Sequence, residues 1–306
     1  MRILLLGSTG FLGRHAAGRL RALPGARVLV GGRTPGCALP VDLATADPGR
    51  LAAVLRTAAP LDAVVNCAGA VGGSALTLTA VNARGPAVLC EALHEAAPAA
   101  RLVHLGSAAE YGPAEGHRPL TETGPARPLG LYGASKLAGT LAVAGSGLDA
   151  VVLRVFNPVG PGSPASSLSG RLAAELHRAG PDGRVRTGDL SAYRDFVDAR
   201  DVADAIARAV TAAGPLPGVL NIAGGTARPV RDIAEGLLRA AGSAGRAGER
   251  IEEDGDGSPR SAAVPWQQAD ITAACRALGW TPRHGLDDSL AGLWAETRGR
   301  TPERVR

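Results

Sequence analysis

Short, nearly uninterrupted apolar runs recur along the first half of this chain, and they constrain its fold more than any other feature. They cover Ile3 to Gly7, Arg27 to Val30, Ala63 to Asn66, Leu102 to Leu105 and Val151 to Val155, with amphipathic segments between them. A strand with one face in water alternates polar and apolar residues, whereas these runs are apolar on both faces. Strands of this kind belong to a parallel sheet that helices cover on both sides. The sequence therefore predicts a doubly wound α/β fold.

A glycine-rich turn follows the first of these strands. Its sequence is Gly7-Ser8-Thr9-Gly10-Phe11-Leu12-Gly13, and a helical pattern begins within it. Glycines at this spacing let the backbone approach a pyrophosphate at the N-terminus of the helix. The pattern alone is weak in a chain with 42 glycines, but its place at the first strand-to-helix junction favours a phosphate-binding turn. We therefore expect a Rossmann-type fold whose dinucleotide contacts include Gly7, Thr9, Gly10, Phe11, Leu12 and Gly13.

The end of the second strand bears on the choice between NAD and NADP. An NAD enzyme usually has Asp or Glu there to bind the ribose hydroxyls, but this chain has Gly31-Gly32-Arg33. An arginine suits the 2′-phosphate of NADP, although it could also be a solvated surface residue in so arginine-rich a chain. We expect NADP(H) as the preferred cofactor, with NAD(H) as the alternative and Arg14 as a candidate second contact. Asp42 and Leu43 follow a third, short strand, from which Asp42 could reach the adenine.

The second half of the chain departs from the regular alternation of strands and helices. Gly/Pro-rich stretches at 158–164 and 180–188 flank a helical segment, Leu168 to Ala179. We expect the chain to leave the sheet in these stretches. We expect a dinucleotide-binding Rossmann domain and a smaller, largely C-terminal substrate-binding lobe. The domain comprises residues 1–158 and 193–222, and the lobe comprises residues 159–192 and 223–306.

Composition and charge exclude several classes of function. The formal net charge of +5 comes from arginines spread along the chain, without the basic block and interleaved aromatic residues of a nucleic-acid surface. No apolar run is long enough to span a membrane, and the first residues lack the length and cleavage site of a secretory signal. The four cysteines show no metal-ligand spacing. We expect a cytoplasmic protein with no metal, no nucleic-acid partner and no membrane attachment, whose ligand is a small anionic molecule.

Positive charge in this chain comes from thirty-two arginines and a single lysine, Lys136. That lysine stands four residues after a tyrosine, in Leu131-Tyr132-Gly133-Ala134-Ser135-Lys136, so both side chains lie on one face of a predicted helix. Arginine presents a rigid fork, whereas an ammonium is a compact charge that can sit beside a phenol and lower its pKa. The pairing could arise by chance and needs support from neighbouring motifs.

Ser107 supplies that support. It follows the strand Leu102 to Leu105 in Gly106-Ser107-Ala108-Ala109-Glu110-Tyr111-Gly112, about twenty-five residues before the tyrosine helix. With Asn66-Cys67-Ala68-Gly69 and Asn82, essentially the whole chain resembles the extended short-chain dehydrogenase/reductase family, which contains nucleotide-sugar epimerases, dehydratases and reductases. The resemblance implies a catalytic triad of Ser107, Tyr132 and Lys136. It also implies cofactor contacts from Cys67, Ala68, Gly69, Asn82, Tyr132 and Lys136.

The residue types of this triad indicate a mechanism. A phenol with a pKa near 10 is a poor acid-base catalyst at neutral pH, but a neighbouring ammonium and an oxidised nicotinamide would lower that pKa. Tyr132 would then exchange a proton with a carbonyl oxygen, to which Ser107 donates a hydrogen bond. Lys136 would also hold the nicotinamide ribose, and the cofactor would carry the hydride.

The two residues after the serine narrow the reaction. In this family, sugar 4,6-dehydratases have an acidic pair there, decarboxylases have a glutamate at the second position, and the epimerase-reductases that make GDP-fucose have a cysteine at that position. Here both residues are alanines, Ala108 and Ala109, which cannot ionise. The resemblance therefore implies simple hydride transfer at one carbon, as in a ketoreductase, or reversible transfer to the same substrate, as in a 4-epimerase.

Two segments of the second half look like the GDP-4-keto-6-deoxy-mannose reductase branch of the family. They are 154–164, which contains Asn157, and 188–202, which contains Arg194. The likeness implies a diphosphate contact from Asn157, and Arg194 and Arg260 as candidates to clamp the pyrophosphate. Where that branch tends to have Arg-Pro-x-Asp-Val-Pro, this chain has Arg260-Ser261-Ala262-Ala263-Val264-Pro265. The implied substrate contacts are Ser107, Ala108, Ala109, Asn157, Arg194 and Arg260.

These features together predict NADPH-dependent reduction of the 4-keto group of a nucleotide-activated 4-keto-6-deoxyhexose, with Tyr132 as proton donor. Two alternatives stay open. One is a nucleotide-sugar 4-epimerase with tightly bound NAD, against which Arg33 argues; the other is a non-catalytic dinucleotide-binding protein, against which the complete triad argues. The nucleotide can be GDP, dTDP or UDP. The family resemblance also implies a homodimer formed through the helices Leu76 to Ala96 and Leu131 to Ala144.

Overall fold

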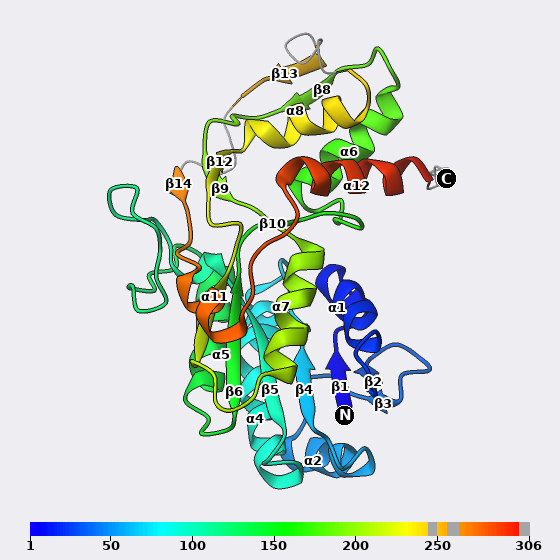
Figure 1. The fold of residues 1–306 in the computed structure, drawn as a ribbon, viewed down its shortest axis with the longest axis vertical. Helices are drawn as coiled ribbons and strands as arrows, with labels where there is room; N and C mark the ends of the chain where they lie inside the picture. Colours follow the sequence, from blue (N-terminus) through cyan, green and yellow to red (C-terminus); the bar gives the residue numbers. More distant parts are fainter. Residues whose placement is uncertain (244–249, 256–262, 300–306) are drawn as a thin grey trace.

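A seven-stranded parallel sheet organises the molecule (Figure 1). The computed structural model describes residues 1–243, 250–255 and 263–299. The strands run in the order β11-β6-β5-β4-β1-β2-β3, and every neighbouring pair is parallel. Their bounds are β1 Arg2–Leu6, β2 Arg27–Gly32, β3 Leu39–Pro40, β4 Ala63–Asn66, β5 Arg101–Ser107, β6 Ala150–Val155 and β11 Val219–Ile222. All five predicted apolar runs are strands of this sheet.

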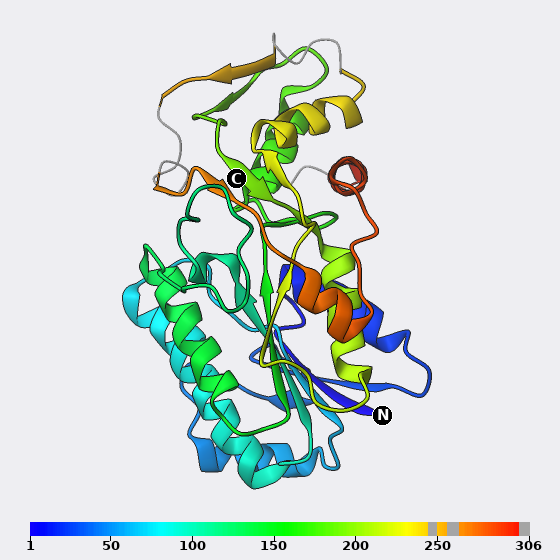
Figure 2. The same cartoon turned by 60° about the vertical axis from the view of Figure 1, so that its left-hand side comes forward.

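Both faces of the sheet are covered by helices, which confirms the doubly wound fold. In β1, Ile3 and Leu5 pack into one apolar cluster while Leu4 and Leu6 pack into another, so the strand is apolar throughout because each face has its own core. Figure 2 shows α4 and α5 on the opposite side of the sheet from α1 and α7. The helices on the first face are α1 Phe11–Arg21, α7 Ala199–Thr211 and α11 Thr272–Leu278, and those on the second are α2 Pro48–Thr57, α4 Gly85–Ala96 and α5 Leu131–Ala144.

The helix predicted over Leu76 to Ala96 is not regular in the structure. It consists of α3 (Ala75–Thr79), a π-helical turn η1 (Ala80–Arg84) and α4. A Cβ atom added to Gly139 of α5 would lie 2.1 Å from the carbonyl oxygen of Asn82, so the two helical segments approach each other closely at this turn. Widened turns of this kind are often found at functional sites.

A second group of elements lies beyond the C-terminal ends of the strands, in the upper part of Figure 1. It has a separate apolar core, to which the helices contribute Leu172, Leu176, Leu237, Leu238 and Leu290. Its helices are α6 Leu168–Ala179, α8 Arg231–Ala240 and α12 Leu286–Gly299, and the short strands nearby are β7 Pro158–Val159, β8 Val185–Thr187, β9 Tyr193–Asp195, β10 Val197–Asp198, β12 Ala227–Pro229, β13 Ile251–Glu253 and β14 Trp266–Gln267. The predicted helix over Leu168 to Ala179 is confirmed. The division into a dinucleotide-binding domain and a substrate-binding lobe stays a proposal.

No helix among the described residues combines the length and the apolar character that a membrane span needs. Within the same residues, no three His, Cys, Asp or Glu side chains are grouped so that they could hold a metal ion.

Candidate active site

The turn after β1 has the geometry of a phosphate cradle. Gly7 has a φ of +77°, a conformation that L side chains rarely adopt, and a Cβ atom there would lie 2.5 Å from the Ala68 nitrogen. A Cβ atom at Gly13 would lie 2.0 Å from the Gly7 carbonyl oxygen, so helix and strand can approach only because both residues are glycines. Helix α1 begins at Phe11 without a side-chain cap on its first N–H groups. Those groups can therefore bind an anion, and the turn fits the pyrophosphate of a dinucleotide.

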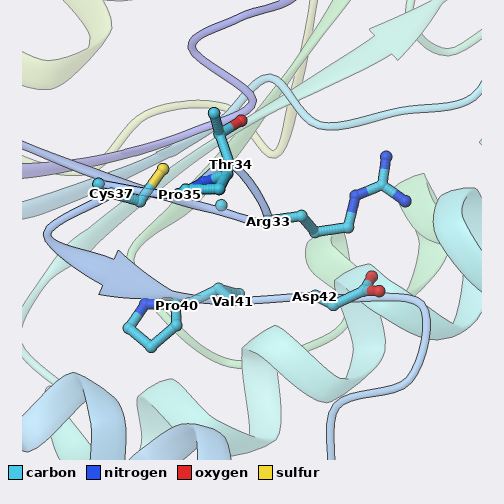
Figure 3. A pocket seen from close by; sticks show the side chains of 9 residues that line it. Arg33, Thr34, Pro35, Cys37, Pro40, Val41 and Asp42 are labelled. Atoms are coloured by element: carbon cyan, nitrogen blue, oxygen red, sulfur yellow. The ribbon is translucent and has the colours of Figure 1, made fainter.

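A pocket of about 560 Å³ opens at the ends of β2 and β3, beside this turn in the sheet order. Its lining includes Arg33, Thr34, Cys37 and Asp42, and Figure 3 shows the Arg33 and Asp42 side chains extending in the same direction from two neighbouring segments. Arg33 is exposed, while Asp42 is partly buried and accepts a hydrogen bond from the Ala44 N–H over 3.1 Å. The predicted pair of Arg33 and Asp42 thus lies in one pocket.

Arg14 does not line that pocket. Its guanidinium donates hydrogen bonds to the carbonyl oxygens of Thr9 and Gly162, each over 3.3 Å. The next residue, His15, contacts the Pro161 carbonyl oxygen at 2.8 Å. Helix α1 is therefore joined to the loop after β7, and a contact between Arg14 and the cofactor stays a prediction.

The segment after β4 connects the phosphate turn to the catalytic residues. Asn66 accepts a hydrogen bond from the Ala68 N–H over 3.0 Å and contacts His104 Nδ1 at 3.1 Å, which fixes the chain at Cys67 and Ala68. A Cβ atom on Gly69 would lie 3.5 Å from Asn82 Oδ1 and 3.9 Å from Lys136 Nζ. The predicted cofactor contacts of this segment therefore lie next to the lysine.

Asn82 holds this segment against helix α5 from within the π-helical turn. Its side chain accepts from the Ala70 N–H over 2.9 Å and donates to the Ala70 carbonyl oxygen over 2.8 Å. It also donates to Ser135 Oγ over 3.1 Å, and Ser135 in turn donates to the Tyr132 carbonyl oxygen over 2.8 Å. Asn82 is thus connected to the turn of helix that carries Tyr132 and Lys136.

The first turn of α5 packs directly on the turn that carries Ser107. Ser107 ends β5 and caps a short 3-10 helix, η2 (Ala108–Glu110), where its Oγ accepts from the Ala109 N–H over 3.2 Å. A Cβ atom at Gly133 would lie 2.3 Å from the Ala109 carbonyl oxygen. A glycine at this position lets the segment that carries Tyr132 approach the serine turn.

Lys136 is buried, with 5% of its surface exposed, and its Nζ donates to the Leu105 carbonyl oxygen over 2.5 Å. Burial lowers the pKa of Lys136 to about 8, although the negative charge of Glu110 acts in the opposite direction. Burial also raises the pKa of the Cys67 thiol to about 12, so that thiol is neutral. Burial and the charge of Lys136 hold the pKa of His104 well below its usual value, so the imidazole is neutral as well.

The predicted substrate residues lie along one connected path. Gln267 of β14 donates from its amide to the Ala108 carbonyl oxygen over 3.0 Å, and its register partner in β9 is Arg194. Asn157, with a φ of +29°, donates to the Asp195 carbonyl oxygen over 2.8 Å. The turn after Ser107 is therefore linked to both Arg194 and Asn157. Arg260 lies outside the described residues.

Arg194 is 5% exposed, so it is not a solvated surface arginine. The next residue, Asp195, accepts hydrogen bonds from the backbone N–H groups of Gly224, Gly225 and Ala269, at 2.7 to 3.1 Å. Burial raises the pKa of Asp195 to about 7, although these backbone hydrogen bonds act in the opposite direction. The carboxylate joins three chain segments around the strand that carries Arg194.

Several residues of the site were not singled out by sequence reasoning. Asp195, Gln267 and Ser135 act through partners that are distant or specific to the fold, and no local pattern marks them. Glu110 is different, because Ser107-Ala108-Ala109-Glu110 has the S-x-x-E spacing of a capping box, and the structure contains both of its hydrogen bonds. That spacing could have identified Glu110.

A tyrosine and a buried lysine one helical turn apart, packed against the serine turn at the end of β5, place the chain among the short-chain dehydrogenases/reductases. Within that class the chain belongs to the NAD dependent epimerase/dehydratase family, whose sequence pattern matches residues 3–223. It is therefore an enzyme of a family of NAD(P)-dependent nucleotide-sugar oxidoreductases and epimerases.

Named relatives include a dehydrogenase and a reductase. The dTDP-6-deoxy-L-talose 4-dehydrogenase (NAD(P)(+)) of Kitasatospora kifunensis is 38% identical, covering 96% of this chain and 94% of the relative. The GDP-6-deoxy-D-mannose reductase of Pseudomonas aeruginosa is 29% identical, covering 76% of this chain and 78% of the relative. Among solved structures, MoeE5 in complex with UDP-glucuronic acid and NAD has a TM-score of 0.82 and 26% identity, covering 98% of this chain and 99% of that one.

A structure of RMD from Pseudomonas aeruginosa complexed with NADPH has a TM-score of 0.81 and 24% identity, with 98% and 99% coverage. At this identity the likeness shows the shared fold. These structural relatives therefore include one that binds NAD and one that binds NADPH.

Proposed function

We propose that this enzyme reduces, and in reverse oxidises, C4 of a nucleotide-activated 6-deoxyhexose, with NADPH as the preferred electron donor and dTDP as the nucleotide. The choice of C4 and of dTDP is supported by the 38% identical relative, a dTDP-6-deoxy-L-talose 4-dehydrogenase that matches almost the full length of this chain. Arg33, exposed in the pocket at the end of β2, supports NADPH because a guanidinium can pair with a 2′-phosphate.

In the direction of reduction, Tyr132 gives its phenolic proton to the C4 oxygen of the keto sugar, and Ser107 donates a hydrogen bond to that oxygen. When bound, the reduced nicotinamide supplies the hydride that C4 receives. The carbonyl thereby becomes a secondary alcohol, and Tyr132 is left as a phenolate. Lys136 stabilises this negative charge and is held in place by its bond to the Leu105 carbonyl oxygen. We place Asn157 and Arg194 at the diphosphate of the substrate.

One observation supports this assignment: of the three residues that follow Ser107, none offers a free acid or base to move a proton at a neighbouring carbon of the substrate. Ala108 and Ala109 lack an ionisable side chain, and Ala108 is buried. Glu110, the next residue, is also buried, and its two oxygens accept hydrogen bonds from the Ser107 N–H and from Arg154. Dehydration needs proton transfer next to the carbonyl, whereas ketone reduction needs only the triad and a hydride donor.

The proposal is tested by following absorbance at 340 nm with purified protein, NADPH or NADH, and a 4-keto-6-deoxyhexose generated in place from dTDP-glucose by a 4,6-dehydratase. A parallel reaction uses the GDP-4-keto sugar, and the Tyr132→Phe protein is the control. We expect decay that prefers NADPH and the dTDP sugar and that disappears in the variant. Retained NAD, with C4 epimers forming without net loss of NADPH, would instead establish a 4-epimerase. Dinucleotide binding without either reaction would contradict the proposed reaction with these two sugars.

We also propose a homodimer formed through α3 and α5. Leu76 on α3 and Leu141 on α5 are 78% and 63% exposed, and the two helices contact each other on the same face of the sheet. Burying such side chains against a second copy would remove apolar surface from water.

A further inference from the structure

A buried ionic pair lies next to the catalytic serine, outside the set of residues that the proposed reaction uses. Glu110 has no exposed surface, and its Oε2 accepts a hydrogen bond from Arg154 Nε over 2.7 Å. The guanidinium carbon of Arg154 lies 4.6 Å from the centre of the Tyr111 ring. The Tyr111 hydroxyl donates to Asn221 Oδ1 over 2.7 Å. The pair is therefore enclosed by polar and aromatic partners within the protein.

The second oxygen of Glu110 fixes the backbone of the serine. Its Oε1 accepts a hydrogen bond from the Ser107 N–H over 2.7 Å, while Ser107 Oγ accepts from the Ala109 N–H. A Cβ atom on Gly106 would lie 2.8 Å from Glu110 Oε1 and 3.1 Å from Arg154 Cγ. The glycine thus leaves the space in which the carboxylate lies against the strand.

The same stretch of backbone also holds the lysine. Lys136 Nζ donates to the Leu105 carbonyl oxygen, two residues before the N–H group that Glu110 binds. The buried ammonium and the buried carboxylate therefore attach to neighbouring peptide groups at the end of β5.

Among the charged and titratable groups described around Lys136, Glu110 provides the opposite charge. The Cys67 thiol after β4 and the His104 imidazole on β5 are neutral, because burial raises the pKa of the first to about 12 and lowers that of the second. Tyr132 lies on the same helix as the lysine, and Arg154 on β6 is a cation. Among the described residues that act on Lys136, Glu110 is the carboxylate, and its charge raises the lysine pKa against the effect of burial.

We propose that Glu110 is a positioning residue of this active site: its carboxylate fixes the peptide of Ser107 and is the buried counter-charge of Lys136. The positioning of Ser107 rests on the proposed function, whereas the charge relation between Glu110 and Lys136 can be measured without any substrate.

The charge relation is tested by NMR titration, for which this chain is well suited because Lys136 is its single lysine. Protein labelled with [ε-13C]lysine gives one resonance, and its shift against pH reports the Lys136 pKa directly. We expect Glu110→Gln to lower the titration midpoint by about one pH unit or more, as removal of a close opposite charge should. Glu115→Gln is the matched control, since the Glu115 side chain is 84% exposed and pairs with Arg127 at the surface. Its midpoint should equal that of the wild type.

A second variant covers the case in which Glu110→Gln does not fold. Glu110→Gln combined with Arg154→Gln removes the ionic pair as a unit and leaves no buried charge without a partner. We expect the Lys136 midpoint to fall in this protein as well. An unchanged midpoint in whichever of the two proteins is folded would overturn the charge relation.

The positioning of Ser107 has a separate test. Glu110→Asp keeps the charge but is one methylene too short to reach both the Ser107 N–H and Arg154. We expect the kcat for NADPH oxidation with the dTDP-4-keto sugar to fall about tenfold or more, with KM little changed and the Lys136 midpoint near that of the wild type. An unchanged kcat would overturn this role. Absence of turnover in the wild type would contradict the proposed function and leave the NMR result standing.

Discussion

Replacing Lys136 with methionine should make the protein more stable at neutral pH. The lysine pKa falls from an ordinary 10.5 to about 8 on folding, which corresponds to about 3 kcal/mol, since one pKa unit is about 1.36 kcal/mol. Methionine has a similar length and no charge to bury. Losing the hydrogen bond to the Leu105 carbonyl oxygen offsets roughly 2 kcal/mol of that gain. The net effect at pH 7 is a stabilisation of about 1 kcal/mol.

The pH dependence of this difference has a definite sign. Between pH 8 and 10.5 the unfolded wild-type chain holds a proton on Lys136 that the folded protein has lost. The unfolded state then binds more protons, so the free energy of unfolding of the wild type rises with pH relative to the variant. From pH 7 to pH 9.5 the two pKa values give a change of about 2 kcal/mol. The variant should therefore be the more stable protein at pH 7 and the less stable one at pH 9.5.

The assay is urea unfolding of both proteins at the two pH values, followed by circular dichroism. Groups that Lys136 does not act on titrate alike in the two proteins and cancel, so the difference between their free energies of unfolding reports Lys136 together with the neighbours that its charge acts on, such as His104 and Cys67. A difference that stays constant between pH 7 and 9.5 would refute the reasoning, because it would mean that folding does not desolvate the amine.

Three further predictions concern the site and its surroundings. Gly133→Ala should reduce kcat about tenfold or more, because the added Cβ would lie 2.3 Å from the Ala109 carbonyl oxygen. Gly130→Ala is the control and should leave kcat unchanged, since no atom lies within 4 Å of its added Cβ. Steady-state kinetics of both proteins test this prediction. Arg33→Ser should raise the KM for NADPH about tenfold or more and leave the KM for NADH unchanged, and equal changes for both cofactors would contradict its role. Leu141→Glu should convert a dimer to a monomer in size-exclusion chromatography with light scattering, and an unaltered mass would place the dimer interface elsewhere.

The sheet could be predicted from sequence because its strands have a local signature. A strand buried on both faces is apolar at every position, as in β1, and this pattern does not depend on knowing its neighbours. The bounds of α6 could also be predicted from sequence, because residue types typical of helix ends flank it. Ser167 accepts a hydrogen bond from the Gly170 N–H at its start, and Gly180, with a φ of +70°, follows its end.

The small strands beyond the main sheet could not be predicted in this way. The strands β8 and β13 have three residues each, and they pair across more than sixty positions of sequence. Segments this short have no usable period, and only the tertiary structure determines their partners. The π-helical turn at Asn82 was likewise missed, because it accompanies the close approach of Gly139 from another helix.

The residues of the candidate site also differ in whether a local sequence pattern identifies them. Ser107, Tyr132 and Lys136 follow from spacing and from the family resemblance, and the structure places the serine turn against their helix. Gln267 contacts Ala108 from 159 positions away, so no local reading of the sequence could connect them.

The burial of the single lysine also determines how the one side-chain amine of this protein reacts with acylating reagents. Its positively charged surface is made of guanidinium groups, and the one ε-amino group is 5% exposed. Acylating reagents, aldehyde crosslinkers and succinimidyl-ester supports therefore find no lysine on the surface of the folded protein. Unfolding exposes that amine, so lysine acylation becomes a chemical record of the fraction of molecules that have lost their native structure.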